Sequence, residues 1–241
     1  MNATRTVMVA WFVISVGLLS ESMVSPLAAQ EAPSADKQAR EKYVASLPKD
    51  VHPDSGNRLP LIKREELDEE LKKVYDATTS NPNTVAGVRG PNGIRMRSAG
   101  LMRSRGRETA YLRYQSTIGR RHVELAILLT ARAFDAQFEW TLHELEGLEV
   151  GLEQAVIDVV KHNKPLTGLN EKDAALIQLG RETFGKTTVS SETFARALQA
   201  FGQETLVEIV ALMGQSAATA VLLHTFDQQL PPGQEPLLVI P

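Results

Sequence analysis

HVELAILLTARAFDAQFEWTLHELEG, residues 122–147, is the stretch that decides the fold. Its apolar residues recur at spacings of three and four, which places them along one side of an α-helix. Asp135 interrupts the pattern, and aspartate is a preferred residue for capping the start of a helix. We therefore predict two helices, at about 120–133 and 136–149, the first of which must fold back on the second if side chains of the two are to meet.

The rest of the chain is also mostly helical in pattern. An amphipathic run at 63–78 comes first, and a glycine-rich loop at 80–100 follows it. Asn170 and Ser190 stand where they can cap later helices. The sequence has no alternating run long enough to predict a β-strand. We expect an all-α domain, with further helices near 99–117, 151–162, 171–184, 191–201 and 203–226.

The N-terminus has the order of a secretory signal peptide. Arg5 precedes Val7–Leu19, an uncharged apolar run of thirteen residues, and Ala28 and Ala29 then offer a cleavage point. The apolar run is short for a membrane-spanning helix. We expect residues 1–29 to be removed during export to the periplasm or the outside of the cell, with no stable membrane insertion afterwards. An uncleaved membrane anchor is the alternative.

Three regions follow the predicted signal peptide. Residues 30–62 are rich in proline, serine and charge, and they predict an N-terminal arm rather than a packed element. Residues 63–233 are the predicted helical domain. Within it, the run 203–226 is apolar on nearly all sides and is expected in a core or a subunit interface. Residues 234–241 form an apolar tail that can pack on its own domain or on a neighbouring subunit.

Composition excludes several kinds of chemistry. The net charge is −3, so nucleic acid is not an expected partner. The sequence contains no cysteine, which rules out disulfides, thiolate metal sites and thiol redox chemistry within this chain. Only five histidines are present, so imidazole-rich metal sites are limited as well.

Arginines concentrate in and after the predicted loop. Between Arg89 and Arg121 there are nine arginines against a single acid, Glu108, in a chain that is acidic overall. These arginines can be surface charge or can form ion pairs between subunits. Guanidinium groups also match carboxylates in bidentate pairs, so we expect Arg97 or Arg121 to bind a carboxylate on a ligand.

The best candidate for a chemical site lies in the opening stretch. Glu139 and His143 are four residues apart and therefore share one helix face, beside Trp140. A carboxylate next to an imidazole orients the ring and raises its basicity, so the pair suits general acid/base catalysis. Glu124 lies on the preceding helix, where it can support the histidine or pair with an arginine such as Arg120.

Two other interpretations of these residues stay open. The spacing of Glu139 and His143 occurs by chance in many helices and can be purely structural. Two carboxylates and one imidazole, from Glu124, Glu139 and His143, also suit a divalent metal ion. A fourth ligand and an HExxH-like signature are both missing, so we expect no bound metal.

The sequence resembles the carboxymuconolactone decarboxylase family, which also contains the AhpD-like alkylhydroperoxidases. The resemblance is carried by RGPNGIRMRSAGL (89–101), RRHVELAILLTARAFDAQFEWTLHELEGLEVGL (120–152) and VALMGQSAATAVLLHTFDQQLPPG (210–233). It implies an all-helical, AhpD-like domain that assembles as a trimer, hexamer or related homo-oligomer. Cysteine-free members are similar to the decarboxylase branch, which implies chemistry without a metal or organic cofactor.

In the thiol-peroxidase members of that family, a glutamate precedes two cysteines and a histidine at fixed spacing. The matching positions here are Glu124, Ala136, Glu139 and His143, so the acid and the histidine are kept and both cysteines are replaced. The resemblance therefore implies no thiol peroxidase or disulfide reductase activity. Arg97 stands where the loop of the decarboxylase branch commonly has a histidine.

Together, the residues and the resemblance suggest an exported, decarboxylase-like lyase that acts on a small carboxylated substrate by decarboxylation, lactone chemistry or isomerisation. Glu139 and His143 would serve as acid and base, Glu124 would support the histidine, and Trp140 would wall the pocket. The alternative is a non-catalytic ligand-binding or assembly protein on the same scaffold. A metal hydrolase is a third interpretation.

Overall fold

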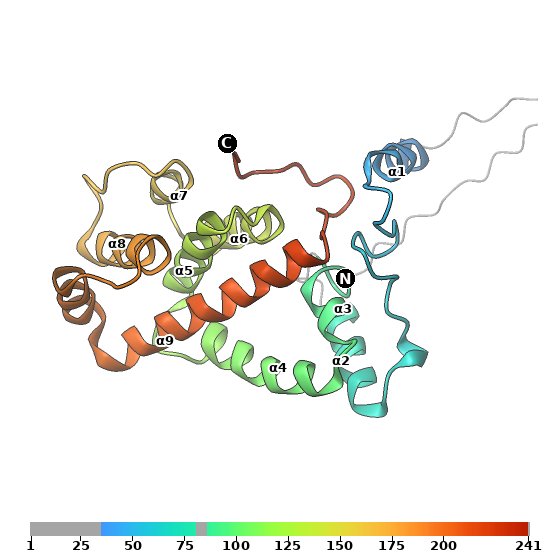
Figure 1. Ribbon diagram of the computed structural model, residues 1–241, viewed down its shortest axis with the longest axis horizontal. Coiled ribbons are helices and arrows are strands. Elements are labelled where there is room, and N and C mark those ends of the chain that lie inside the picture. Colours follow the sequence, from blue (N-terminus) through green and yellow to red (C-terminus); the bar gives the residue numbers. More distant parts are fainter. Residues whose placement is uncertain (1–34, 81–85, 241) are drawn as a thin grey trace, which may run out of the picture.

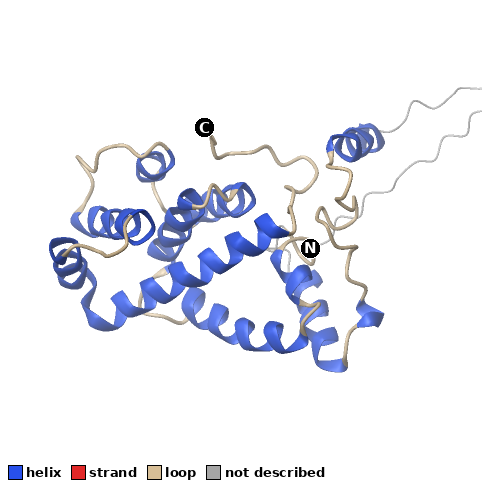
Figure 2. Cartoon of the chain, in the orientation of Figure 1, coloured by secondary structure: helices blue, strands red, loops and turns tan. Residues whose placement is uncertain are grey.

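In a computed structural model that describes residues 35–80 and 86–240, the chain folds into packed α-helices, and no β-strand occurs among these residues (Figure 1 and Figure 2). The predicted all-α class is confirmed. The predicted signal peptide lies outside the described residues. The elements in chain order are α1 (Ala35–Ser46), the 3-10 helix η1 (Arg64–Glu66), α2 (Glu69–Ser80), α3 (Pro91–Arg95), α4 (Ala99–Tyr114), α5 (Arg120–Ala133), α6 (Gln137–Glu149), α7 (Gln154–Lys161), α8 (Glu171–Gly185) and α9 (Ser191–Thr225).

Helix α5 lies at the centre of the main hydrophobic core. Every residue from Val123 to Ala131 is buried, so α5 is enclosed on all sides and not only on the one side that its apolar spacing predicted. It packs against α6, α7, α8 and α9, and Figure 1 shows α9 running across the domain beside it. The two predicted helices of the opening stretch are present as α5 and α6, and they fold back on each other as a contact between Glu124 and His143 requires.

Two of the three predicted helix caps are present. Asn170 accepts a hydrogen bond from the backbone N–H three residues further on, and Ser190 does the same at the start of α9. The prediction for Asp135 is wrong. Its backbone adopts a φ of 49°, and its carboxylate pairs with Arg132 at the end of α5 instead of capping α6.

Helix α9 is broken at Gly202. The φ of 76° and ψ of 172° at this residue are not helical, and glycine adopts positive φ without steric cost. The predicted division into helices near 191–201 and 203–226 is therefore confirmed. By length and composition α9 could span a membrane, and half of its most apolar stretch is buried inside the domain.

A second, smaller hydrophobic cluster holds the N-terminal part of the domain together. The predicted helix at 63–78 contributes to it, but the regular α-helix begins only at Glu69. The carboxylate of Asp68 accepts a hydrogen bond from the backbone N–H of Leu71 at 2.8 Å and caps the helix there. The buried members of this cluster are Ile62, Leu67, Leu71, Met96 and Met102.

The segment predicted as a loop, 80–100, contains the short helix α3. Pro91 stands in its first turn, where the fixed φ of proline suits a helix and its missing N–H costs nothing. Helix α3 packs against α4 and α9. This packing brings Arg95 to the wall of the cavity described below.

The predicted N-terminal arm is packed in part. Helix α1 is mostly exposed, but Val51, Ser55 and Asn57 are buried. The side-chain amide of Asn57 donates to Oε1 of Gln228 at 2.9 Å, just beyond the end of α9. The prediction of an unpacked arm is therefore wrong for this turn, because its polar groups find partners on the C-terminal segment.

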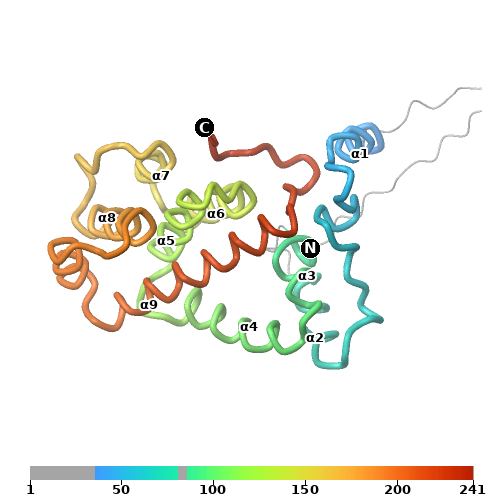
Figure 3. The backbone as a smooth tube through the Cα atoms, viewed as in Figure 1, coloured from blue at the N-terminus to red at the C-terminus, as the bar shows by residue number. Residues whose placement is uncertain are grey.

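The C-terminal tail packs on its own domain. In Figure 3 the red end of the tube leaves α9 and returns past α6. The backbone N–H of Leu237 donates to the hydroxyl of Thr141 on α6 at 3.2 Å, and Leu238 is buried. The sequence left open whether the tail packs on its own domain or on a neighbouring subunit, and in this structure it packs on its own domain.

Candidate active site

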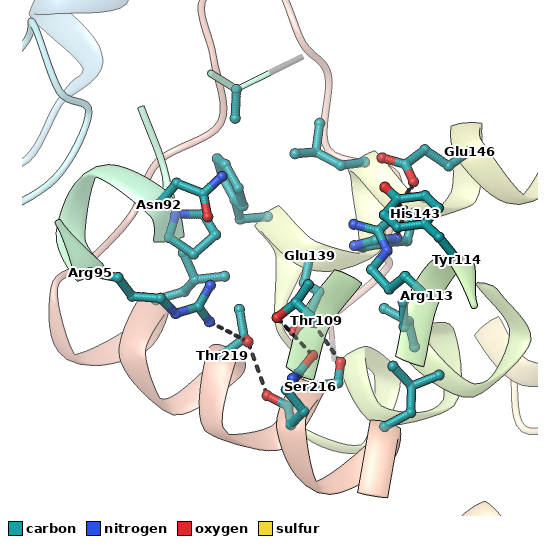
Figure 4. Close-up of a pocket in the computed structure, with 18 of the residues that line it drawn as sticks. Asn92, Arg95, Thr109, Arg113, Tyr114, Glu139, His143, Glu146, Ser216 and Thr219 are labelled. Carbon is teal, nitrogen blue, oxygen red and sulfur yellow. Dashed lines mark hydrogen bonds and ion pairs between the residues drawn. The ribbon is translucent and has the colours of Figure 1, made fainter. Parts of the chain in front are cut away.

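A cavity of about 630 Å³ lies between α3, α4, α6 and α9. This volume is typical of pockets that bind small molecules. Figure 4 shows Arg95 and Thr219 on one side of the cavity, Arg113 and His143 on the other, and Glu139 between them. The apolar part of the lining includes Ile127, Phe138, Leu142, Leu212 and Leu223.

A buried carboxylate holds the histidine of this cavity. Oε2 of Glu124 lies 2.7 Å from Nδ1 of His143, and Glu124 is fully buried. Burial acts to raise the pKa of Glu124, but His143, Arg113 and Arg120 together outweigh it, and the pKa lies below its ordinary value. Ionised Glu124 therefore accepts a hydrogen bond from Nδ1–H of His143, which leaves the lone pair of the ring on Nε2.

Two arginines complete an ion-pair network around Glu124. Nη2 of Arg120 lies 3.0 Å and Nη2 of Arg113 lies 3.5 Å from Oε1 of Glu124, and Arg113 also pairs with Glu146. Ligand atoms of Glu124, His143 and Glu146 lie within 4.8 Å of one another. Because guanidinium groups already contact both carboxylates, the set fits an ion-pair network rather than a divalent metal site.

Glu139 is also buried, but it is not part of the Glu124–His143 pair. Its Oε1 accepts a hydrogen bond from the Ser216 hydroxyl on α9 at 2.5 Å, and its Oε2 has no hydrogen-bond partner among the described residues. Burial raises the pKa of Glu139 above its ordinary value, although His143 and Arg95 oppose this. A carboxyl group kept neutral can donate a proton. Glu139 and His143 thus share the cavity, as predicted, but each has its own hydrogen-bond partner.

Two side chains of the cavity, Arg95 and Gln215, have hydrogen-bonding groups that a ligand could use. Arg95 donates to Thr219 at 2.6 Å but forms no ion pair with a carboxylate in the described part of the chain. Its pKa is lowered to about 10, first by burial and then by Arg105, with Glu139 opposing. Nε2 of Gln215 is buried and, within residues 35–80 and 86–240, has no partner. Native proteins rarely leave such donors unpaired, so a ligand carboxylate or carbonyl suits them.

The two arginines predicted to bind the ligand do not line the cavity. Arg97 pairs with Glu66 at 3.3 Å, and Arg121 pairs with the buried Asp173 at 2.7 Å. Both therefore hold segments of the fold together. Three other arginines of the cluster, Arg95, Arg113 and Arg120, line the cavity instead, and of these Arg95 is the one that contacts no carboxylate among the described residues.

Trp140 also lies away from the cavity. It is fully buried in the main core, and its indole N–H donates to the carboxylate of Glu144 at 2.5 Å. The other oxygen of Glu144 accepts from Lys161 at 2.7 Å. Trp140 therefore supports the packing of α6, and the aromatic ring that walls the cavity from this helix is that of Phe138.

The sequence did not single out Arg95, Gln215 or Ser216 as site residues. Arg95 is one of nine similar arginines, and nothing local distinguishes it. Gln215 and Ser216 do carry a signal, because they are adjacent polar residues inside an otherwise apolar helix. Such residues need partners when the helix is buried, and here they line a cavity.

No protein-family model and no curated protein matches the sequence. Solved structures do match the fold. The alkylhydroperoxidase AhpD core of an uncharacterized peroxidase-related protein from Ralstonia eutropha aligns with a TM-score of 0.60 at 15% identity, covering 77% of this chain and 100% of that one.

Two further structures agree with this fold. The debrominase Bmp8, solved as a variant in complex with 2,3,4-tribromopyrrole, aligns with a TM-score of 0.56 at 15% identity, covering 71% of this chain and 90% of that one. An Agrobacterium tumefaciens protein of unknown function, described as a candidate antioxidant defence protein AhpD, gives 0.52 at 18% identity, with 56% and 93% covered. The chain therefore has the AhpD-like fold, and the fold implied by the sequence resemblance is confirmed.

Proposed function

We propose that this protein is an enzyme that carries out acid/base chemistry, without a metal or organic cofactor, on a small carboxylated molecule. The observation that carries the proposal is the contrast between two buried carboxyl groups near one cavity. The pKa of Glu139 is raised, whereas that of Glu124, hydrogen-bonded to His143, is lowered. Titratable groups whose environments push their pKa values apart are typical of an acid and a base assigned to different roles.

Each group then has a defined task. Arg95 and Gln215 bind the substrate carboxylate or carbonyl, because both line the cavity. Among the described residues Arg95 has no carboxylate partner, only the hydroxyl of Thr219, and Nε2 of Gln215 has no acceptor. Nε2 of His143 removes a proton from the substrate, and Glu124 stabilises the imidazolium that results. Glu139, whose raised pKa favours the protonated form, donates its proton at another position of the substrate. Such positioned proton transfers typically contribute about 10²–10⁴-fold in rate.

The same groups serve either of two reactions. In an isomerisation, proton removal by His143 and proton delivery by Glu139 shift a double bond and leave the substrate mass unchanged. In a decarboxylation, the bond to the carboxylate breaks, carbon dioxide leaves, and the proton of Glu139 takes its place on carbon. Both reactions balance without an external oxidant or reductant.

One solved structure supports binding of a small ligand, whereas the sequence of this chain argues against the thiol chemistry of a peroxidase. The debrominase structure holds a single substituted five-membered ring, so a compound of that size is bound by a protein of this fold. A thiol peroxidase reaction needs a cysteine nucleophile, and this chain contains none. Thiol peroxidase activity is therefore not part of the proposed function, although two of the proteins with this fold are described as peroxidase-related or AhpD-like.

The proposal includes export and self-association. Export is supported by the signal-like order of residues 1–29. Self-association into a trimer or hexamer is supported by apolar residues on the outer face of α9, where Val207, Val210 and Val221 are exposed. Light scattering coupled to size-exclusion chromatography of the mature protein would measure the oligomer directly.

The test is a substrate screen on the purified mature protein. A mixture of small carboxylic acids and lactones is incubated with it, and mass spectrometry detects loss of carbon dioxide or rearrangement at constant mass. We expect His143→Ala and Glu139→Gln to reduce turnover by at least about 10²-fold, and His162→Ala, outside the cavity, to leave it unchanged. Full turnover by His143→Ala would falsify the assignment, and binding without turnover would favour the non-catalytic alternative.

A further inference from the structure

A second cavity, of about 710 Å³, lies on the far side of one wall of the candidate active site. It is lined by α1, by the start of α6 and by the C-terminal segment that follows α9. Phe138 and Leu223 are the two side chains that line both cavities. They are therefore the partition between the two spaces, and both are almost completely buried.

The ring of Phe138 is held in place by the segment that leads into α3. Gly90 has a φ of 100°, and a Cβ added there would lie 2.8 Å from Cζ of Phe138. No other residue type fits between this backbone and the ring without displacement of one of them. Because α3 starts at the next residue and carries Arg95, the partition and the anion-binding group belong to one packed unit.

The partition is also close to the proposed chemistry. Phe138 immediately precedes Glu139, and Leu142 and His143 follow one helical turn later on the same cavity wall. A substrate held by Arg95 near Glu139 therefore meets Phe138 as soon as it extends toward the second cavity. The second cavity contributes space to the substrate only when this ring is absent.

We infer that Phe138, together with Leu223, sets the upper length of the substrate and restricts the site to short, compact monocarboxylates. This inference rests on the proposed function, because it takes a carboxylate bound at Arg95 as one end of the ligand. Phe138 is then a specificity residue that takes no part in proton transfer. Shortening its side chain joins the two cavities and admits longer acids.

The test uses two homologous series of probes on the full chain. Straight-chain monocarboxylates from propanoate to decanoate, and the matching primary alcohols, are titrated by calorimetry. In the unmodified protein we expect affinity to rise with length and then to fall sharply at a cut-off. In Phe138→Leu and Phe138→Ala the cut-off moves to longer probes, each added methylene strengthening binding by about fourfold.

A matched control separates loss of the partition from general loosening of the core. Phe184→Leu shortens a phenylalanine that packs on the main core and lines neither cavity. We expect it to leave the cut-off unchanged. If Phe138→Ala folds poorly, Phe138→Leu and Leu223→Ala provide the same readout. An unchanged cut-off in the folded partition variants overturns the inference.

The two series also distinguish this inference from the proposed function. If Arg95→Gln leaves the affinity for acids unchanged, the carboxylate assignment is wrong, while a cut-off shift among the alcohols still supports the partition. Arg95→Gln could weaken binding of the acids while the partition variants leave the length cut-off unchanged in both series. In that case the proposed function stands and the length limit is wrong. If neither series binds, both are wrong.

Discussion

Oε2 of Glu124 on α5 and Nδ1 of His143 on α6 lie 2.7 Å apart, so one hydrogen bond joins the central helix of the core to the helix that walls the cavity. The carboxylate is fully buried, whereas the ring lies at the cavity. The bond therefore contributes both to stability and to the state of the proposed base. Variants of the buried partner should change both properties together.

Glu124→Ala should lower the free energy of unfolding by about 3–5 kcal/mol at neutral pH, because it removes the buried carboxylate that His143, Arg113 and Arg120 all contact. The folded-state pKa of Glu124 lies below its ordinary value. Its stabilisation is therefore present above the ordinary pKa and is lost as pH falls through the folded-state pKa. Urea unfolding at neutral and acidic pH should show the gap between variant and unmodified protein shrinking in acid. A gap of constant size, or an equal loss in Glu149→Ala, would contradict this.

Glu139→Gln should have the opposite pH dependence. Burial raises the pKa of Glu139 above its ordinary value of 4.5, so the stability it contributes in the neutral form is present at low pH and is lost as pH rises through the folded-state pKa. The variant keeps the size of the side chain and cannot ionise. Thermal unfolding between about pH 5 and about pH 8 should find it more stable relative to the unmodified protein at the upper end. A difference that does not change with pH would show that Glu139 is not the group responsible.

Arg121→Ala should destabilise the fold strongly although Arg121 was predicted to bind a ligand. It pairs with Asp173, which is fully buried and whose pKa is held well below its ordinary range. Removing one partner of such a pair costs about 3–5 kcal/mol. Arg97→Ala is the matched comparison, because its pair with Glu66 lies at the surface and should contribute about 0–1 kcal/mol. Chemical denaturation measures both, and equal losses would refute the distinction.

Removal of the leader can be checked by intact mass spectrometry of protein recovered after export. We expect the mature chain to begin at Gln30, after cleavage behind Ala29. Val13→Glu should block export, because it places a charge in the centre of the apolar run. Recovery of a chain that still begins with Met1 would instead support the uncleaved anchor.

The sequence predicted the helical framework well because the relevant signals are local. The periodicity of 122–147 predicted α5 and α6, and Gly202 marked the break in α9. The failures also have local causes. The helix predicted from residue 63 begins only at Glu69, where Asp68 caps it, and Asp135 pairs with the arginine three residues before it instead of capping α6.

The site was only half predictable. Glu124 and His143 belong to neighbouring helices, so their meeting follows from the α5–α6 hairpin. Arg95 reaches the cavity through the packing of α3 on α9, which is a long-range contact with no sequence signature. Arg121 was misassigned for the same reason: its buried partner, Asp173, is 52 residues away in the chain.

The break at Gly202 makes the pocket-bearing half of α9 independent of what precedes it in the chain. In a continuous α-helix, inserting one residue would rotate every later side chain by about 100°, which would carry Ser216 away from Glu139. Because the helix is interrupted, a rotation of residues 191–201 about their own axis is not transmitted to the segment with Gln215 and Ser216. A change before the break therefore acts on its own contacts, where Ala197 is fully buried in the core, and not on the orientation of the cavity wall.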